Sequence, residues 1–408
     1  MTDQPYLPSS AVTKTERIKK RVSTSLDRWA IAGLFLYLAA FYFLDSSGQK
    51  TLFYLLVGIP GLILIPRLLE LYRQRPVELT MLAVFLIYMS ASSLWSGTST
   101  LDDALKYSMY LMCLLLVIDA AARQGVTTVH VLNWLLVVGA VAAVCYASAL
   151  LGRFDSSSNW ALARFSFEGM AGWGDDNPIS SAIVLGLTVL IAWWKFPMSG
   201  RGKQLLLVAL MLLCFVLILL TKSRGPLVAL GIVLGLMSLH RRALGDLVLW
   251  GALLLSVAVG LVLFDLAGPL ADRFAQPNYR MEIWSAAFTQ IGDDIFAGQG
   301  FGREADIMIR PGVVVTHSHS SFVEIIRIGG LMGGALVIAL LWSVFVRRGV
   351  LSAGTGLFVF WFVYGIGCLS TNGRLPLIRP TIEWFAFWLP LLLTLRFASQ
   401  PFRFNFRE

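Results

Sequence analysis

The chain has 408 residues, of which 57% are hydrophobic and 14% are charged, and its formal net charge is +9. A soluble protein would carry about a quarter charged residues, so the composition excludes an ordinary soluble domain. The four cysteines all lie in apolar runs without the spacing of metal ligands, which is typical of small core residues.

Apolar runs recur along almost the whole chain. A helix needs roughly 20 predominantly apolar residues to cross a bilayer, so we predict an all-α polytopic membrane protein with about twelve transmembrane helices. The run that follows the N-terminal tail is succeeded by DSSGQK, which offers no small-residue cleavage pattern, so we expect a retained helix there. The expected spans lie near 29–44, 51–66, 79–96, 104–121, 128–150, 178–195, 204–221, 226–239, 245–267, 321–346, 352–371 and 384–398.

The distribution of charge predicts the orientation of these spans. The tail at residues 1–28 is basic, and with twelve spans its side holds 20 of the 33 Lys and Arg but 8 of the 24 Asp and Glu. Short cytoplasmic loops are enriched in Lys and Arg, so we expect both termini, 1–28 and 399–408, in the cytoplasm. Nine helices would fill residues 29–267 and three would fill 321–398. The basic balance is then a topology signal and does not indicate nucleic-acid binding.

On the opposite, outer side of the membrane we expect one large, partly helical loop over residues 268–320. A shorter feature on that side is the turn TKSRGP, in which Lys222 and Arg224 lie between two apolar runs. Cations at helix ends often extend to the membrane surface without further purpose. The alternative is a site for an anion at that surface.

The large loop contains a helical pattern that begins at Arg280. Trp284 follows four residues later, so both side chains lie on one helical face, as an ordinary surface pair or as a site for a sugar or phosphate. The glycines at 298, 300 and 302 lack the strand and helix context of a dinucleotide site and indicate a tight turn.

Two pairs of acidic residues in the outer loops could in principle hold a divalent metal. They are Asp175 with Asp176, and Asp293 with Asp294. Neither pair has a nearby histidine at ligand spacing, and such residues are typical of turns and helix caps. We therefore expect no metal and no cofactor.

The segment THSHSSFVEIIRIGG holds two of the four histidines. Ser321 and Glu324 have the spacing of a capping box, so we expect a helix that begins at Ser321, with His319 just before it. The positive end of the helix dipole disfavours an imidazolium, and a neutral imidazole can act as a general base. Arg327 can pair with Glu324, either structurally or as a functional cation. The small-xxx-small pairs Gly329/Gly333 and Gly330/Gly334 are typical of helix packing.

These residues together resemble the O-antigen ligases of the O-antigen ligase/polymerase superfamily of membrane glycosyltransferases. The resemblance is carried by three motifs in order on one side of the membrane, over residues 215–334. They are the segment around Arg224, then Arg280-x-x-x-Trp284, and then His319-Ser320 with Gly330 and Gly333 at fixed spacing. The first half of the chain matches in topology only.

The resemblance implies a fold similar to GT-C-type glycosyltransferases and an active site on the periplasmic side of the inner membrane of Gram-negative bacteria. The expected reaction transfers an O-antigen glycan from undecaprenyl diphosphate to the lipid A–core and so completes lipopolysaccharide. His319 would be the general base, with His317 in support. Arginine binds phosphate through its bidentate fork, so the cations expected to hold the diphosphate are Arg224, Arg280, Lys222 and Arg164. One base without a protein nucleophile predicts inversion, although Glu324 could serve as a nucleophile in a two-step route.

Three other functions share parts of this pattern. An O-antigen polymerase or a protein O-oligosaccharyltransferase would have the same histidine and arginines. The polymerase-like spacing of Arg153 and Gly169 carries little weight, because 36 glycines make chance matches common. A transporter or lipid flippase usually has repeated halves and broken helices at the bilayer midplane. This chain has no internal repeat, and its polar residues gather at one face.

Overall fold

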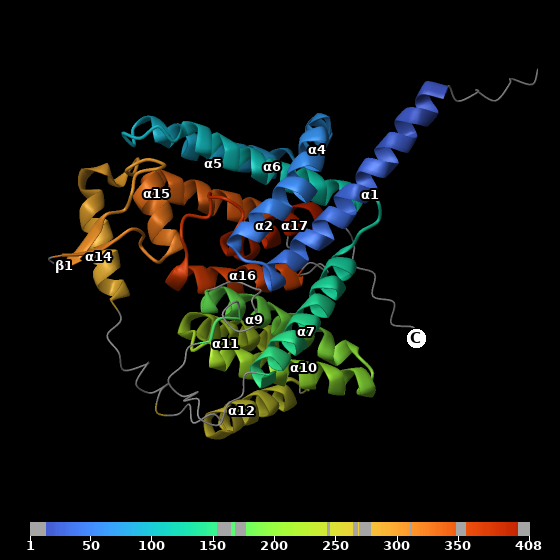
Figure 1. Cartoon of the computed structure of the whole chain (residues 1–408). Helices are drawn as coiled ribbons and strands as arrows, with labels where there is room; N and C mark the ends of the chain where they lie inside the picture. Colours follow the sequence, from blue (N-terminus) through green and yellow to red (C-terminus); the bar gives the residue numbers. More distant parts are fainter. Residues whose placement is uncertain are drawn as a thin grey trace, which may run out of the picture.

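The structure is a computed structural model. It describes residues 14–152, 165–167, 177–242, 245–263, 268, 279–310, 312–347 and 356–398. Most of these residues are helical, and the strands among them form a single hairpin (Figure 1). The helices and strands of the described part are α1 Lys14–Phe43, α2 Ser46–Phe53, α3 Ile59–Ile63, α4 Leu68–Gln74, α5 Pro76–Ala91, α6 Leu101–Arg123, α7 Thr128–Gly152, α9 Pro178–Lys195, α10 Arg201–Leu220, α11 Arg224–Arg241, α12 Gly245–Leu263, α14 Arg280–Ile291, β1 Ile307–Arg310, β2 Val313–Val315, α15 Ser321–Leu341, α16 Gly356–Asn372 and α17 Leu389–Phe397.

Each of the twelve expected spans overlaps a helix, and the all-helical membrane class is confirmed. Within the described part of the chain, seven helices are long and apolar enough to cross a membrane, or eight if one bent pair counts as a single span. The bent pair, Ser46–Ile63 and Ile65–Gln74, meets at 56°. Pro66 follows the break, and a proline cannot donate the backbone hydrogen bond that a continuous helix needs. The total of twelve spans and the GT-C-type likeness stay predictions.

The helices pack in two groups that share one continuous core. In Figure 1, α1, α5, α6, α15 and α17 lie in the upper group, and α7, α9, α10, α11 and α12 lie in the lower group, with α16 between them. Large aromatic side chains fill the core, including Trp193, Trp361, Trp384 and Trp388, each at most 1% exposed. Gly365 lets α16 approach its neighbour so closely that a Cβ there would lie 1.9 Å from the carbonyl oxygen of Ala386.

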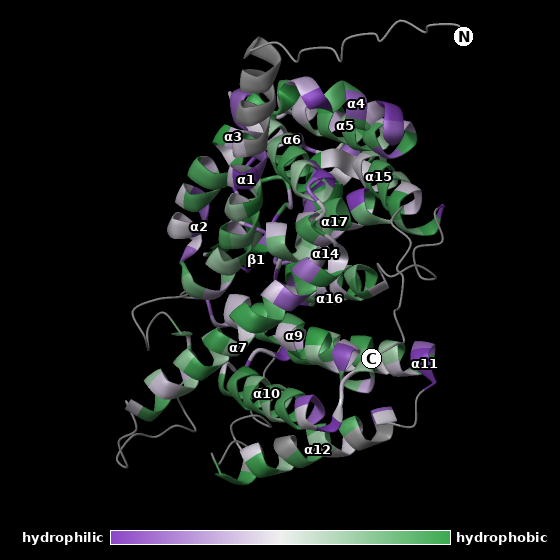
Figure 2. Ribbon diagram, turned by 90° about the vertical axis from the view of Figure 1, so that its right-hand side faces the viewer, coloured by the Kyte–Doolittle hydropathy of each residue, from purple (hydrophilic) through white to green (hydrophobic). Residues whose placement is uncertain are grey.

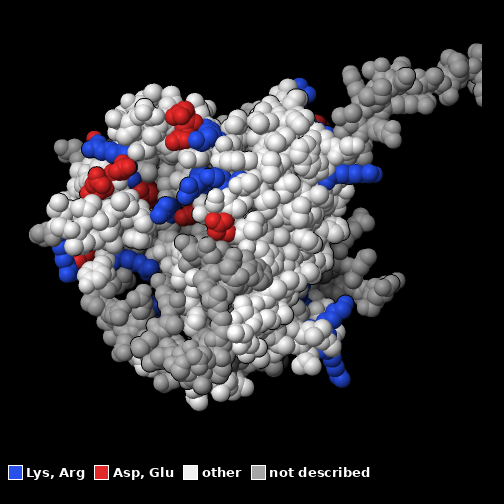
Figure 3. All heavy atoms as spheres, viewed as in Figure 1, with Lys and Arg blue, Asp and Glu red and all other residues white. Residues whose placement is uncertain are grey.

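The outer surfaces of the helices suit contact with lipid. Figure 2 shows hydrophobic residues over α7, α10 and α12, and exposed apolar side chains include Val141, Leu206 and Val262. Charged groups gather at the two ends of the helices instead. On the face in Figure 3, acidic and basic side chains mix at the left, around α14 and β1, whereas the right side carries mainly Lys and Arg. The mixed charges thus lie around the large loop, and the mainly basic side is the opposite one, as the distribution of Lys and Arg along the sequence predicts.

A buried carboxylate connects the last helix to the first half of the chain. Asp119 of α6 is fully buried, and its two oxygens accept hydrogen bonds from Arg123 and Arg396, each at 2.6 Å. Arg123 also donates to Glu70, at 2.7 Å. A buried charge is tolerated only when it is paired and hydrogen-bonded, so α17 must dock for Asp119 to be fully satisfied.

We predict that Asp119→Ala destabilises the protein strongly, because it leaves two arginines without their buried partner. Removing one member of a buried ion pair costs about 3–5 kcal/mol. The matched control is Glu70→Ala, which removes a partner of the same Arg123, but one whose side chain is 57% exposed. Its expected cost is below about 1 kcal/mol. Thermal unfolding of the purified variants in detergent measures both, and equal midpoints would contradict the prediction.

Candidate active site

A small second core holds the loop that precedes α15. It is formed by Ile283 and Ala287 of α14, Ile307 of β1, Ala305, and Val323 of α15. The β1–β2 hairpin is antiparallel, with a register shift between Met308 and Arg310. The expected partly helical loop is therefore present as α14 and this hairpin, packed on the start of α15.

The glycine turn of this loop packs into a break in α15. Gly298, Gly300 and Gly302 all have positive φ, and a Cβ at Gly300 would lie 2.4 Å from a backbone oxygen of Ser92. Gly330 has φ +63° inside α15, which breaks the helix, and a Cβ there would lie 2.3 Å from the carbonyl oxygen of Phe296. The tight turn is confirmed. The prediction that Gly330 belongs to a helix-packing pair is wrong, because this glycine breaks the helix where the glycine turn packs against it.

Gly329 behaves as expected for helix packing. A Cβ at this position would lie 2.9 Å from Met89 Sδ, on α5. The small-residue pattern at 329–334 therefore serves both packing against α5 and the break in α15.

The expected Glu324–Arg327 pair forms and is buried. Arg327 donates to Glu324 Oε1 at 2.6 Å, and the two side chains are 3% and 5% exposed. Arg327 also donates to Gln299 Oε1 at 3.1 Å and to the carbonyl of Arg303 at 3.0 Å. Its hydrogen bonds therefore hold the glycine turn against α15, so the structural interpretation of Arg327 is the one that fits.

The helix start is confirmed at Ser321, but the capping residue differs from the expectation. Ser320 is the N-cap, and its side chain accepts a hydrogen bond from the backbone of Val323. Ser321 instead donates to the carbonyl of Arg374, at 2.5 Å. Glu324 faces residues 317–320, which we call the histidine loop. Its Oε2 accepts a hydrogen bond from the backbone N–H of Ser318 at 3.4 Å.

The two histidines lie side by side just before α15. Their ring centroids are 3.9 Å apart, and His319 has φ +53°. Trp284 donates from its indole to the carbonyl of Ser318, between the two histidines, at 3.1 Å. The indole at the predicted Arg280–Trp284 face therefore holds the histidine loop in place.

The surroundings keep both imidazoles neutral. Burial, followed by the positive charges of Arg280 and Arg374, lowers the pKa of His319 below its usual 6.5. Burial, His319 and Arg374 lower the pKa of His317 to about 4. The direction of the pKa shift agrees with the expected neutral state of His319, and its role as a base stays a prediction. Burial and the two arginines are physical causes of this lowered pKa that the sequence did not indicate.

Arg374 is a site residue that the sequence did not point to. It follows Gly373, where a Cβ would lie 2.0 Å from Ser321 Oγ, so this segment sits against the start of α15. A few residues earlier, Thr371 lies against the TKSRG turn, where a Cβ at Gly225 would be 2.4 Å from Thr371 Oγ1. The end of α16 and the two residues that follow it thus connect the turn at Arg224 with the start of α15.

The remaining predicted residues fall in different places. Arg224 begins α11, and Lys222 lies in the turn before it, with φ +51° and 8% exposure. Arg164, Asp175 and Asp176 lie outside the described residues. Within the described part of the chain, no three His, Cys, Asp or Glu side chains are arranged to hold a metal ion.

Comparison with known proteins gives two findings. A family model described as O-antigen ligase matches residues 209–338, which includes Arg224, Arg280 and His319. Residues 209–338 are therefore similar to the domain of the O-antigen ligase family. An O-antigen ligase from Pseudomonas aeruginosa is 29% identical over 399 residues, which is 94% of this chain and 94% of the relative. No solved structure matches the chain.

The region that matches this family coincides with the elements that build the site. It begins in α10, ends in α15, and encloses the TKSRG turn, α14, the hairpin and the histidine loop. The predicted resemblance to O-antigen ligases, and the prediction of a membrane enzyme of this type, are confirmed. Both findings support a ligase activity in lipopolysaccharide synthesis.

We predict that Arg327→Met loosens the loop, because it leaves Glu324 buried and unpaired, at a cost of about 3–5 kcal/mol. The double variant Glu324→Gln/Arg327→Met removes both charges and should recover part of that loss. Arg310→Met is the matched control, because its pair with Glu282 is exposed. Unfolding midpoints and the rate of proteolysis within 279–320 measure the effect. If Arg327→Met matches Arg310→Met, the pair does not hold the loop.

Proposed function

We propose that this chain transfers an O-antigen glycan from undecaprenyl diphosphate to a hydroxyl of the lipid A–core, at the periplasmic face of the inner membrane. The single observation that carries the mechanism is the pair of neutral histidines beside Arg280 and Arg374, at the start of α15. This arrangement combines a proton acceptor with cations, which are the two requirements for transfer from a diphosphate-linked donor.

The cations would bind the diphosphate and neutralise the leaving group. Arg224, Arg280 and Lys222 were expected in this role. We add Arg374, because its segment packs against both the TKSRG turn and the start of α15. A guanidinium can bind two phosphate oxygens at once. With the negative charge balanced by these side chains, the transfer needs no metal ion.

His319 would act as the general base. It would accept the proton of the acceptor hydroxyl while that oxygen attacks the anomeric carbon and the bond to the diphosphate breaks. The electron pair of that bond leaves with the diphosphate, so the balance needs no further reactant. His317 lies against His319 and would keep it oriented and partly dehydrated.

Glu324 fits a structural role better than a nucleophilic one. Its side chain is buried, and both of its oxygens are engaged, one by Arg327 and the other by the backbone of Ser318. A two-step route through Glu324 would require breaking these contacts. We therefore favour direct displacement with inversion at the anomeric carbon.

An acceptor panel tests the function itself. The purified protein in liposomes is given a lipid-linked glycan with lipid A–core, with a second lipid-linked glycan, or with a protein, each with and without excess EDTA. We expect transfer to lipid A–core alone, unaffected by EDTA. Elongation of the second lipid-linked glycan would identify a polymerase, and glycosylation of the protein would identify an oligosaccharyltransferase.

We predict that His319→Ala lowers the transfer rate by about 10²–10⁴-fold, which is the usual contribution of general-base catalysis. Donor binding should persist, because the arginines are retained. His317→Ala is the matched control on the same loop and should lose less. Single-turnover rates with saturating donor separate the chemical step from binding. Near-normal transfer by a folded His319→Ala variant would remove this residue from the mechanism.

We predict that the transfer rate is constant near neutral pH and falls as pH drops through the pKa of His319, which lies below 6.5. The sign follows because protonation removes the base. Arg374→Ala removes a positive charge that lowers this pKa, so the fall should move to higher pH. Arg310→Ala, on the same loop, should leave its position unchanged. A pH–rate profile that is identical in the Arg374→Ala variant and the parent would show that Arg374 does not act on the histidines.

A further inference from the structure

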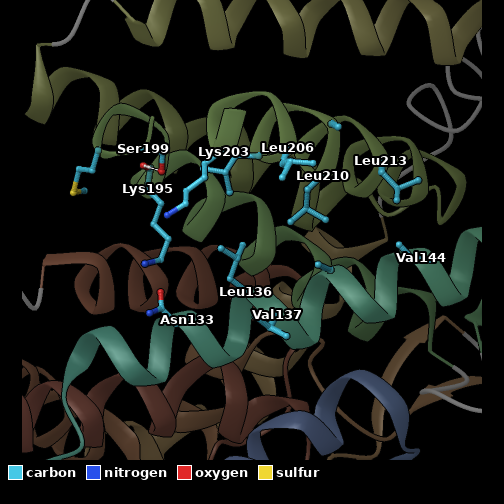
Figure 4. Close-up of a pocket in the computed structure, with 14 residues that line it drawn as sticks. Asn133, Leu136, Val137, Val144, Lys195, Ser199, Lys203, Leu206, Leu210 and Leu213 are labelled. Carbon is cyan, nitrogen blue, oxygen red and sulfur yellow. Dashed lines mark hydrogen bonds between the residues drawn. The ribbon is translucent and has the colours of Figure 1, made fainter. Parts of the chain in front are cut away.

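A groove separates α7 from α10 on the outer surface of the helices, far along the chain from the histidine loop. Its volume is about 700 Å³. Leu136, Val137 and Val144 line it from α7. Leu206, Leu210 and Leu213 line it from α10, as Figure 4 shows. The lining is aliphatic along most of its length, which suits a hydrocarbon chain.

One end of this groove carries two cations. In Figure 4, the side chains of Lys195 and Lys203 extend from the end of α9 and the first turn of α10 toward Asn133 of α7. Neither lysine forms an ion pair with any residue that the structure describes. An amide and two ammonium groups therefore face the same end of an apolar groove, without a carboxylate to balance them.

The start of α10 adds to this positive charge. Gly200 precedes the helix and provides no side-chain cap, and the first turn holds no acidic residue. The N-terminus of a helix carries a partial positive charge, and Lys203 lies three residues into it. Cations at this position are unfavourable by themselves, so the end of the groove is complementary to an anion.

The position of this end in the membrane favours one source for that anion. The α9–α10 turn lies on the side that the distribution of Lys and Arg assigns to the cytoplasm. Anionic phospholipids of that leaflet are attracted to basic residues at helix ends, and basic pockets between transmembrane helices bind their headgroups.

We propose that this groove binds one anionic glycerophospholipid. Its phosphate would lie between Lys195 and Lys203 and accept a hydrogen bond from Asn133. One acyl chain would lie along the leucines of α10 and the valines of α7. The volume is in the range of small-molecule sites, about 300–1,000 Å³, and so suits one chain rather than a whole lipid. The lipid would fill the space between α7 and α10 on the side away from the glycosyl-transfer site.

Native mass spectrometry of the intact purified protein tests this proposal, with phosphatidylglycerol or phosphatidylethanolamine of the same acyl chains added. We expect retention of one phosphatidylglycerol in preference to phosphatidylethanolamine. A lysine near the membrane surface contributes roughly fivefold to anionic lipid binding. Lys195→Gln/Lys203→Gln should therefore weaken phosphatidylglycerol binding by roughly 30-fold. Ala140→Phe, which fills the groove, should release the lipid although both lysines remain.

The matched control is Arg28→Gln/Arg73→Gln, which removes the same charge on the same side of the membrane at exposed positions outside the groove. It should bind phosphatidylglycerol like the parent. Three results would overturn the proposal: equal retention of the two lipids, equal loss in the control, or a lipid-free dimer that separates in the Ala140→Phe variant. The last would mean that a second copy of the chain covers the groove. Because lipid retention is measured without donor or acceptor, its outcome is independent of glycosyl transfer.

Discussion

The buried ion pair of Glu324 and Arg327 is the interaction on which the candidate site depends. Arg327 binds Glu324 and two groups of the glycine turn, and Glu324 binds the backbone of the histidine loop. Two segments without regular structure are thereby attached to one turn of helix at the membrane surface. A buried pair of this kind contributes little net stability compared with apolar residues. Its value here lies in fixing the positions of neighbouring backbone groups.

Around this pair, the protein combines features that would be unfavourable separately. His319 has a left-handed backbone, and α15 is broken at Gly330. Such local strain persists only where the surroundings enforce it, and it concentrates at functional sites. The two arginines near the histidines would have a double effect in the proposed reaction. They lower the pKa of His319, and they would offer positive charge to an anionic donor. The lowered pKa favours the neutral imidazole of His319, which is the state that the proposed proton acceptor needs.

The sequence was informative where a local pattern decides the outcome. Apolar run length located a helix for each of the twelve expected spans, and the spacing of Glu324 and Arg327 predicted their contact. The helix start was correct but its cap was off by one, because Ser320 and Ser321 both satisfy the local chemistry of an N-cap. Contacts between distant segments could not be read in this way. Arg374 reaches the site only because α16 ends against the start of α15, and nothing in its own neighbourhood indicates that position. Gly330 was misassigned for a similar reason. The break that it makes in α15 packs against Phe296 and Gly298, which lie about thirty residues earlier in the chain.

The contact between Asp119 and Arg396 has a consequence for biosynthesis. The two residues are 277 positions apart, and the second belongs to the last helix. Chains grow at roughly 5–20 residues per second, so Asp119 waits roughly 15–55 s in the nascent protein before its second arginine is made. During that interval Arg123, in the same helix, is the partner at hand. When α17 packs against α6, Arg396 supplies the second hydrogen-bonding partner of this carboxylate. The packing of α6 is therefore complete only after α17 has been made.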